Sequence, residues 1–122
     1  MSIYNEIGIK NLQRLGISRA ILARETNLEQ IKKLTQLGTE IEIFVHGALC
    51  MSYSGECLMS TLIGSRSGNR GTCAQCCRQP YSLEIDGEFV SSNEYLLSTK
   101  DLNTLDNIGE LIDSGVNSLK IE

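Results

Sequence analysis

A helical pattern between two apolar runs is the feature that most constrains the fold of this chain. Residues 26–38, "TNLEQIKKLTQLG", carry leucine or isoleucine at the spacing of one helix face. Thr26 or Asn27 can cap the start of this helix, and Gly38 can end it. The flanking runs "ISRAILARE" and "EIEIFVHGAL" each predict a strand. A strand–helix–strand order with short connections predicts parallel pairing and an α/β fold class.

The same signals predict the remaining elements. "NEIGIKNLQRLG" predicts a helix that stops at Gly16, and "YSLEIDGEFV" predicts a β-hairpin that turns at Asp86-Gly87. "TKDLNTLDNIGELIDSG" (99–115) predicts a helix, and "VNSLKIE" a further strand. We expect strands centred near Ile21, Ile43 and Leu119. The apolar face of the helix over 99–115 would consist of Leu105, Ile108, Leu111 and Ile112.

Size and charge exclude several classes of protein. A chain of 122 residues suits one small domain, and a net charge of −4 argues against a wholly basic nucleic-acid-binding module. No apolar run reaches the roughly 18 residues of a membrane span. The start shows no secretion signal, so we expect a cytoplasmic protein without a membrane partner.

The segment from Cys57 to Leu83 contains no acidic residue but carries Arg66, Arg70 and Arg78. These three side chains are candidates for binding phosphates or carboxylates of a substrate. The alternative is a solvated loop whose arginines are structural.

All five cysteines lie in a glycine-containing excursion at residues 50–80. They are Cys50, Cys57, Cys73, Cys76 and Cys77. An odd count without a secretion signal disfavours a disulfide framework, whereas converging soft thiolates favour a metal site. The spacing does not separate iron–sulfur from zinc. Inert buried thiols, or a dithiol switch at Cys73 and Cys76, are the alternatives.

Other catalytic signals are sparse. His46, at a predicted strand end before Gly47, is either a substrate-binding residue or an ordinary polar one. "GSRSG" is not a nucleophile elbow, because arginine stands at its centre, and a single histidine excludes a zinc-protease pair. No catalytic residue is therefore assigned.

The long segment "EIEIFVHGALCMSYSGECLMS" resembles the signature of the peptidase U-32, or collagenase-like protease, family. The resemblance continues through "GSRSGNRGTCAQCCRQPYSL", "EYLLSTKDL" and "LIDSGVNSLKIE". Within the family, the form of "GNRGTCAQCCRQPY" is most similar to the branch tied to hydroxylation of a cytidine in ribosomal RNA. Sister branches are tied to hydroxylation of a tRNA uridine and of ubiquinone.

The resemblance implies a cofactor and an architecture. The family's four-iron four-sulfur (4Fe-4S) cluster ligands fall by residue match on Cys50, Cys57, Cys73 and Cys77, while Cys76 departs from the family pattern. The family has a (β/α) TIM-type barrel, and a full barrel takes about 250 residues. We therefore expect an internal fragment of such a barrel with a long Cys-rich excursion. Its parts would be a βαβ portion (1–49), the cluster-binding excursion (50–80) and a hairpin, helix and final strand (81–122).

Three function classes remain open from the sequence. The first is an iron–sulfur-dependent enzyme that hydroxylates a base of rRNA or tRNA, with RNA as its partner. The second is a protease of the collagenase-like type, and the third is a fragment that is inactive alone. Because part of a barrel leaves strand edges and apolar faces uncovered, we also expect self-association.

Overall fold

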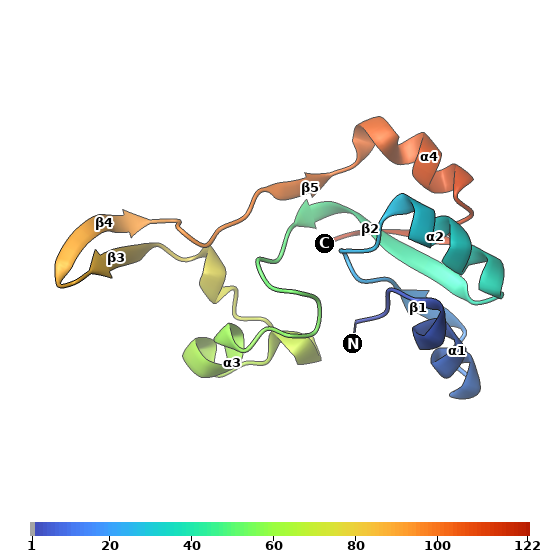
Figure 1. Cartoon of the computed structure of the whole chain (residues 1–122), viewed down its shortest axis with the longest axis horizontal. Coiled ribbons are helices and arrows are strands. Elements are labelled where there is room, and N and C mark those ends of the chain that lie inside the picture. Colours follow the sequence, from blue (N-terminus) through green and yellow to red (C-terminus); the bar gives the residue numbers. More distant parts are fainter. Residues whose placement is uncertain (1) are drawn as a thin grey trace. The chain divides into compact units, whose positions relative to one another are not determined.

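The computed structural model describes residues 2–122, which form a mixed α/β chain of two compact units (Figure 1). Unit 1 comprises the residues up to Leu49 together with Asp101–Glu122, and unit 2 comprises Cys50–Lys100. The helices are α1 (Glu6–Arg14), α2 (Leu28–Leu34), α3 (Met59–Gly64) and α4 (Ile108–Asp113). The strands are β1 (Arg19–Ile21), β2 (Glu40–Ala48), β3 (Tyr81–Ile85), β4 (Glu88–Glu94), β5 (Asp101–Asn103) and β6 (Ser118–Ile121). No helix in residues 2–122 has the length and apolar character needed to cross a membrane.

Strand β2 organises the sheet of unit 1. It pairs in parallel with β1, where Ala20 lies opposite Ile41, and in parallel with β6, where Ile43 lies opposite Leu119. The three predicted strands and the predicted parallel pairing of the first two are therefore confirmed. Within the described residues the four strands form an open sheet, so the (β/α) barrel stays a prediction.

Local capping explains where the first two helices begin. The Asn5 side chain accepts a hydrogen bond from Gly8 N at 2.9 Å at the start of α1. At the start of α2, the Gln30 N–H donates to the Asn27 side chain at 2.9 Å, and the Asn27 N–H donates to the Gln30 side chain at 3.0 Å. The two bonds form a capping box. Gly38 follows α2 and a 3-10 turn (Thr35–Leu37) with φ +80°, a conformation that suits glycine. Both predicted helices are confirmed.

The core of unit 1 follows the alternation of β2. Ile41, Ile43 and Val45 are buried on one face of the strand, while the residues between them are partly exposed. They pack in one cluster with apolar residues of α1 and α2, among them Ile9 and Ile31. Sheet and helices thus share one hydrophobic core in unit 1.

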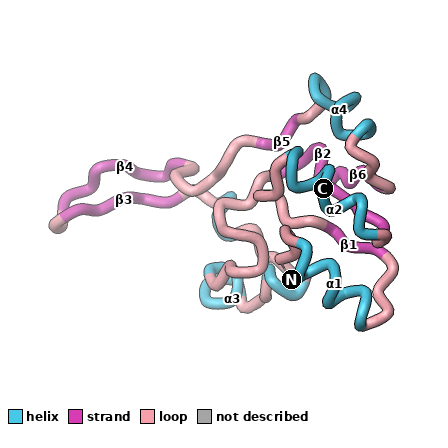
Figure 2. The backbone as a smooth tube through the Cα atoms, turned by 45° about the vertical axis from the view of Figure 1, so that its right-hand side comes forward, coloured by secondary structure: helices cyan, strands magenta, loops and turns pink. Residues whose placement is uncertain are grey.

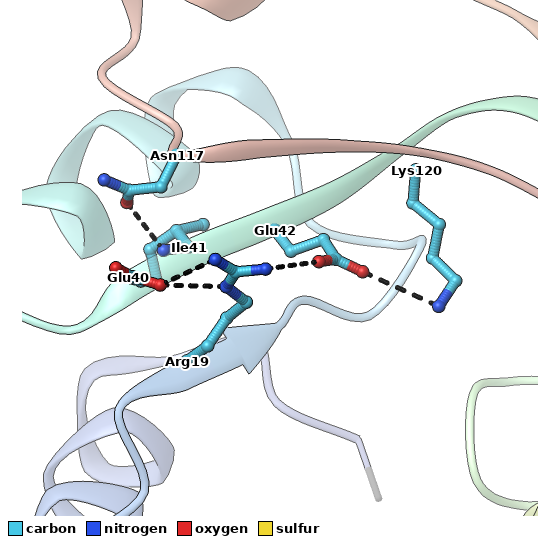
Figure 3. Close-up of polar contacts among 6 residues, drawn as sticks. All are labelled: Arg19, Glu40, Ile41, Glu42, Asn117 and Lys120. Atoms are coloured by element: carbon cyan, nitrogen blue, oxygen red, sulfur yellow. Dashed lines mark hydrogen bonds and ion pairs between the residues drawn. The ribbon is translucent and has the colours of Figure 1, made fainter.

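A network of polar side chains joins the three parallel strands (Figure 3). The Glu42 carboxylate lies 3.6 Å from Arg19 of β1 and 3.6 Å from Lys120 of β6. The Asn117 side chain accepts a hydrogen bond from Ile41 N at 2.8 Å. Because a shift of one residue would turn every side chain to the other face, these contacts reinforce the register of the sheet.

The predicted helix over residues 99–115 is wrong in its first third. Residues 101–103 instead form β5, which pairs antiparallel with the end of β2, with Asn103 opposite His46. The backbone N–H and the hydroxyl of Thr104 both donate to Val45 O, at 3.1 and 2.9 Å. Pairing with a distant strand therefore outweighs the local helical pattern before residue 105.

The predicted apolar face of that helix is half correct. Ile108 and Leu111 pack against the core of unit 1. Leu105 and Ile112 are 73% and 56% exposed. The helix α4 is only six residues long, so it turns one narrow stripe to the core.

At Gly47 the backbone of the neighbouring chain segment comes very close to β2. Its φ is +125°, and a Cβ at this position would lie 1.9 Å from the carbonyl oxygen of Glu122. The Glu122 N–H donates to His46 O at 2.9 Å. β2 therefore continues past Gly47 to Ala48, rather than ending there as expected, because a residue without a side chain admits the neighbouring backbone.

Unit 2 contains the hairpin and the Cys-rich excursion. Strands β3 and β4 run side by side in antiparallel pairing and turn at Asp86 and Gly87, both with positive φ (Figure 2), so the hairpin is confirmed. The excursion holds α3 and two 3-10 turns, Gly68–Arg70 and Cys76–Arg78, where no regular structure was predicted.

Candidate metal centre

A cavity of about 390 Å³ in unit 2 is lined by all five cysteines. Apolar side chains, including Met51, Tyr53 and Leu58, complete its wall. All five thiols are free of disulfide bonds. The excursion therefore gathers residues that are up to 27 positions apart in the sequence around one space.

The segment around Ser60 ties the two ends of the excursion together. Ser60 is 2% exposed, and its hydroxyl donates to Arg66 O at 2.6 Å and accepts from Ala74 N at 2.8 Å. Gly64, at the end of α3, faces the segment that contains Ala74: a Cβ there would lie 2.4 Å from Ala74 Cβ and 3.0 Å from Cys76 Sγ. Close packing of α3 on residues 74–76 thus places Cys73 and Cys77 on either side of a fixed segment.

Hydrogen bonds hold Cys57 through its backbone and Cys73 through its sulfur. The Cys57 N–H donates to Asn69 Oδ1 at 3.0 Å, and Asn69 Nδ2 donates to Cys57 O at 2.9 Å. The Gln75 N–H donates to Cys73 Sγ at 3.3 Å. Asn69 therefore fixes the backbone of Cys57, and the Gln75 amide fixes the sulfur of Cys73.

The two adjacent cysteines Cys76 and Cys77 have different surroundings. Burial, and then the nearby thiols of Cys50 and Cys73, raise the pKa of Cys77, although the Arg78 guanidinium opposes part of this effect. Cys76 is 7% exposed, and its sulfur lies beside Gly64. Cys77 therefore shares its environment with two other predicted ligands, and Cys76 packs against α3.

Single-ion geometry is absent from the described residues. Among residues 2–122, no three His, Cys, Asp or Glu side chains form a group that could hold one metal ion. The five thiols therefore line the cavity without forming such a group.

The predicted substrate-binding residues fall into different settings. Arg66 and Arg70 are exposed in unit 2. Arg78 is partly buried, and its guanidinium donates to Ser98 Oγ at 2.8 Å and to Thr99 O at 2.5 Å. Arg78 thus serves the internal structure of unit 2, which is the structural alternative left open for these arginines.

His46 belongs to unit 1, where its side chain is exposed on β2. Its backbone pairs with Asn103 of β5 and with Ile121 of β6. The structure therefore places His46 in the sheet of unit 1 and all five cysteines in unit 2.

Sequence reasoning missed three residues of this site: Ser60, Asn69 and the cavity-lining Tyr53. Ser60 and Asn69 act through hydrogen bonds to the backbone that exist only in the folded excursion, so no rule of residue spacing predicts them. A polar residue within the motif "SGNRG" was the available signal for Asn69, because Asn is favoured in turns that bond to the backbone.

Comparison with known proteins gives consistent matches over this chain. The model of peptidase family U32 matches residues 1–122. The chain is 50% identical over 93% of its length to 23S rRNA 5-hydroxycytidine C2501 synthase of Escherichia coli, of which it covers 18%. It is 36% identical over 99% of its length to tRNA hydroxylation protein P1 of Bacillus subtilis, of which it covers 31%.

A third relative carries a different kind of name. The chain is 39% identical over its whole length to a collagenase of Porphyromonas gingivalis, of which it covers 37%. No solved structure matches the chain. The chain thus spans well under half the length of each of these three relatives.

Proposed function

The chain belongs to peptidase family U32, and on this premise we propose that it forms part of an enzyme that hydroxylates a pyrimidine base of RNA. The observation that carries the proposal is the 50% identity to a protein named for synthesis of 5-hydroxycytidine in 23S rRNA. The tRNA hydroxylation relative supports the same class of reaction on a different RNA. The activity is proposed for the whole protein that contains this chain.

A 4Fe-4S cluster is the proposed cofactor, held by the thiolates of Cys50, Cys57, Cys73 and Cys77. Four thiolates on one zinc ion would converge to about 3.8 Å from one another, because zinc–sulfur bonds are about 2.3 Å long and tetrahedral. In a cluster each thiolate binds a different iron, so the ligands surround a larger space. The thiol-lined cavity of about 390 Å³ supports the second arrangement.

The reaction itself calls for a redox group. Conversion of cytidine to 5-hydroxycytidine replaces a C–H bond with C–OH, which adds one oxygen atom and removes two electrons from the base. Ordinary side chains do not accept electrons, so a bound cluster would relay the two electrons, one at a time, to an external oxidant. The cavity's cysteines would bind it, and the apolar side chains of Met51 and Leu58 lie at its wall.

The exposed wall of the cavity suits a nucleobase. Tyr53 lines the cavity and is 72% exposed, so its ring is accessible for stacking. Unpaired bases of RNA commonly stack on such aromatic side chains. Arg66 and Arg70, which are exposed in an acid-free segment, would contact phosphates, so RNA affinity would fall with added salt.

Mass spectrometry of nucleosides tests this proposal. Ribosomal and transfer RNA from cells with and without the full-length gene are compared, and a hydroxylated pyrimidine is expected to disappear without the gene. Complementation with Cys50→Ser should fail to restore it, whereas Cys76→Ser should restore most of it, because Cys76 lies beside α3. RNA of unchanged composition would refute the proposal.

The collagenase relative motivates proteolysis as the second candidate. A protease needs an activated nucleophile within hydrogen-bond reach of a base. Ser60 is a poor candidate, since it is buried and its hydroxyl already makes two hydrogen bonds. Cleavage of denatured collagen by pure, metal-free protein, together with unchanged RNA, would establish this second function.

A further inference from the structure

A single side chain pairs with both backbone polar groups of Cys57. The Asn69 carboxamide accepts from Cys57 N at 3.0 Å and donates to Cys57 O at 2.9 Å. This is the pattern by which one strand residue pairs with another, here made by a side chain twelve positions away. Only Asn and Gln carry a donor and an acceptor side by side, so the contact explains the residue type.

The turn that carries Asn69 is itself anchored beside Cys73. Asn69 is the middle residue of the 3-10 turn Gly68–Arg70, and Gly71 closes that turn with φ +80°. Both the backbone N–H and the hydroxyl of Thr72 donate to Ser67 O, at 3.1 and 3.0 Å. The position of Asn69 is therefore coupled to the start of the Cys73 segment.

We propose that Asn69 is a positioning residue that fixes Cys57 relative to Cys73 before any metal binds. The inference rests on the proposed function for its purpose, because preset thiols favour a cluster over random ligation. The two hydrogen bonds between Asn69 and Cys57, which we call the clamp, act together with the hydrogen bond from Ala74 N to Ser60 Oγ. These bonds join the two halves of the excursion. Contacts of this kind behind metal ligands typically change metal affinity by about 10- to 100-fold.

The first test uses the metal-free chain. Asn69→Ala removes both bonds, and we expect faster hydrogen exchange at the Cys57 amide and faster alkylation of the Cys57 thiol. Exchange at the Ala74 amide, which bonds Ser60, should remain at its wild-type rate. Loss of protection throughout residues 57–78 would overturn the proposal, because Asn69 would then be a general structural residue.

The second test uses the chain reconstituted anaerobically with iron and sulfide. Iron loss to a chelator should be about tenfold or more faster in Asn69→Ala. Asn69→Asp keeps the acceptor for Cys57 N but loses the donor to Cys57 O, so its rate should lie between those of wild type and Asn69→Ala. The matched control is Asn107→Ala, at an exposed asparagine that makes no capping bond in unit 1.

The two proposals fail in different ways. A wild-type chain that takes up no iron and sulfide would overturn the cluster, and with it the purpose of the clamp. An Asn69→Ala chain with unchanged exchange at the Cys57 amide would overturn the clamp, whether or not the chain binds iron. Iron loss at the wild-type rate, despite faster exchange, would show that Cys57 is not positioned for metal.

Discussion

Replacing Gly64 with alanine should open the excursion, although alanine favours helices. The added Cβ would lie 2.4 Å from Ala74 Cβ and 3.0 Å from Cys76 Sγ, so α3 or its neighbour must shift. Overpacking of this kind costs about 1–3 kcal/mol. Alanine recovers up to about 1 kcal/mol over glycine inside a helix, and less at the last residue of α3. We expect a net loss of about 1–2 kcal/mol, or about 5- to 30-fold more local opening.

Hydrogen exchange measured by mass spectrometry reports this opening. The amides of Arg66 and Ala74 bond to Ser60, so they should exchange faster in Gly64→Ala. The double variant Gly64→Ala with Ala74→Gly should return exchange toward the wild-type rate, because it removes the nearest atom.

A matched helix glycine separates the clash from helix propensity. Gly109 lies in α4 with no atom within 4 Å of a built Cβ, so Gly109→Ala should slow exchange in α4. If Gly64→Ala leaves exchange unchanged or slows it while Gly109→Ala behaves as expected, the close approach of α3 to residues 74–76 is wrong.

Three further predictions concern a thiol, a cation and the core. Because the pKa of Cys77 is raised in the folded chain, the metal-free folded state keeps a proton that the unfolded chain releases. The unfolding free energy, measured in urea, should therefore fall as the pH rises from about 8 to 10. Cys77→Ser should make this pH dependence weaker. Arg78→Lys cannot reproduce the bonds to Ser98 and Thr99, and should cost about 1–2 kcal/mol, seen as faster exchange in residues 95–100. Ile41→Ala empties a position that is 0% exposed, and should lower the unfolding free energy of unit 1 by about 2–5 kcal/mol in urea.

The sequence predicted best where local chemistry decides the structure. Asn27 and Gly38 bound their helix by capping and by positive φ, both of which depend on neighbours in the chain. The hairpin turn at Asp86 and Gly87 follows the same logic. The alternation of buried residues in β2 marked its inner face, because a strand repeats every two residues.

Prediction failed where a distant partner decides the structure. The local pattern of residues 101–103 predicts a helix, yet these residues form a strand because they pair with the end of β2. Likewise, the cysteine spacing indicated a soft-metal site, but not the different settings of Cys76 and Cys77, which depend on α3 and on the thiols of Cys50 and Cys73. The clamp made by Asn69 is also a contact across the folded excursion.

The divided sequence of unit 1 has a consequence for the order in which the chain acquires its structure. The sheet needs β6, which pairs with β2 only after all of unit 2 has been synthesised between them. Unit 2 is continuous, so its contacts can form earlier and across shorter loops. During translation, β2 would therefore wait with an unpaired edge while the thiol-lined excursion is completed. This interval is a time of aggregation risk, and chaperone dependence during synthesis would follow from it.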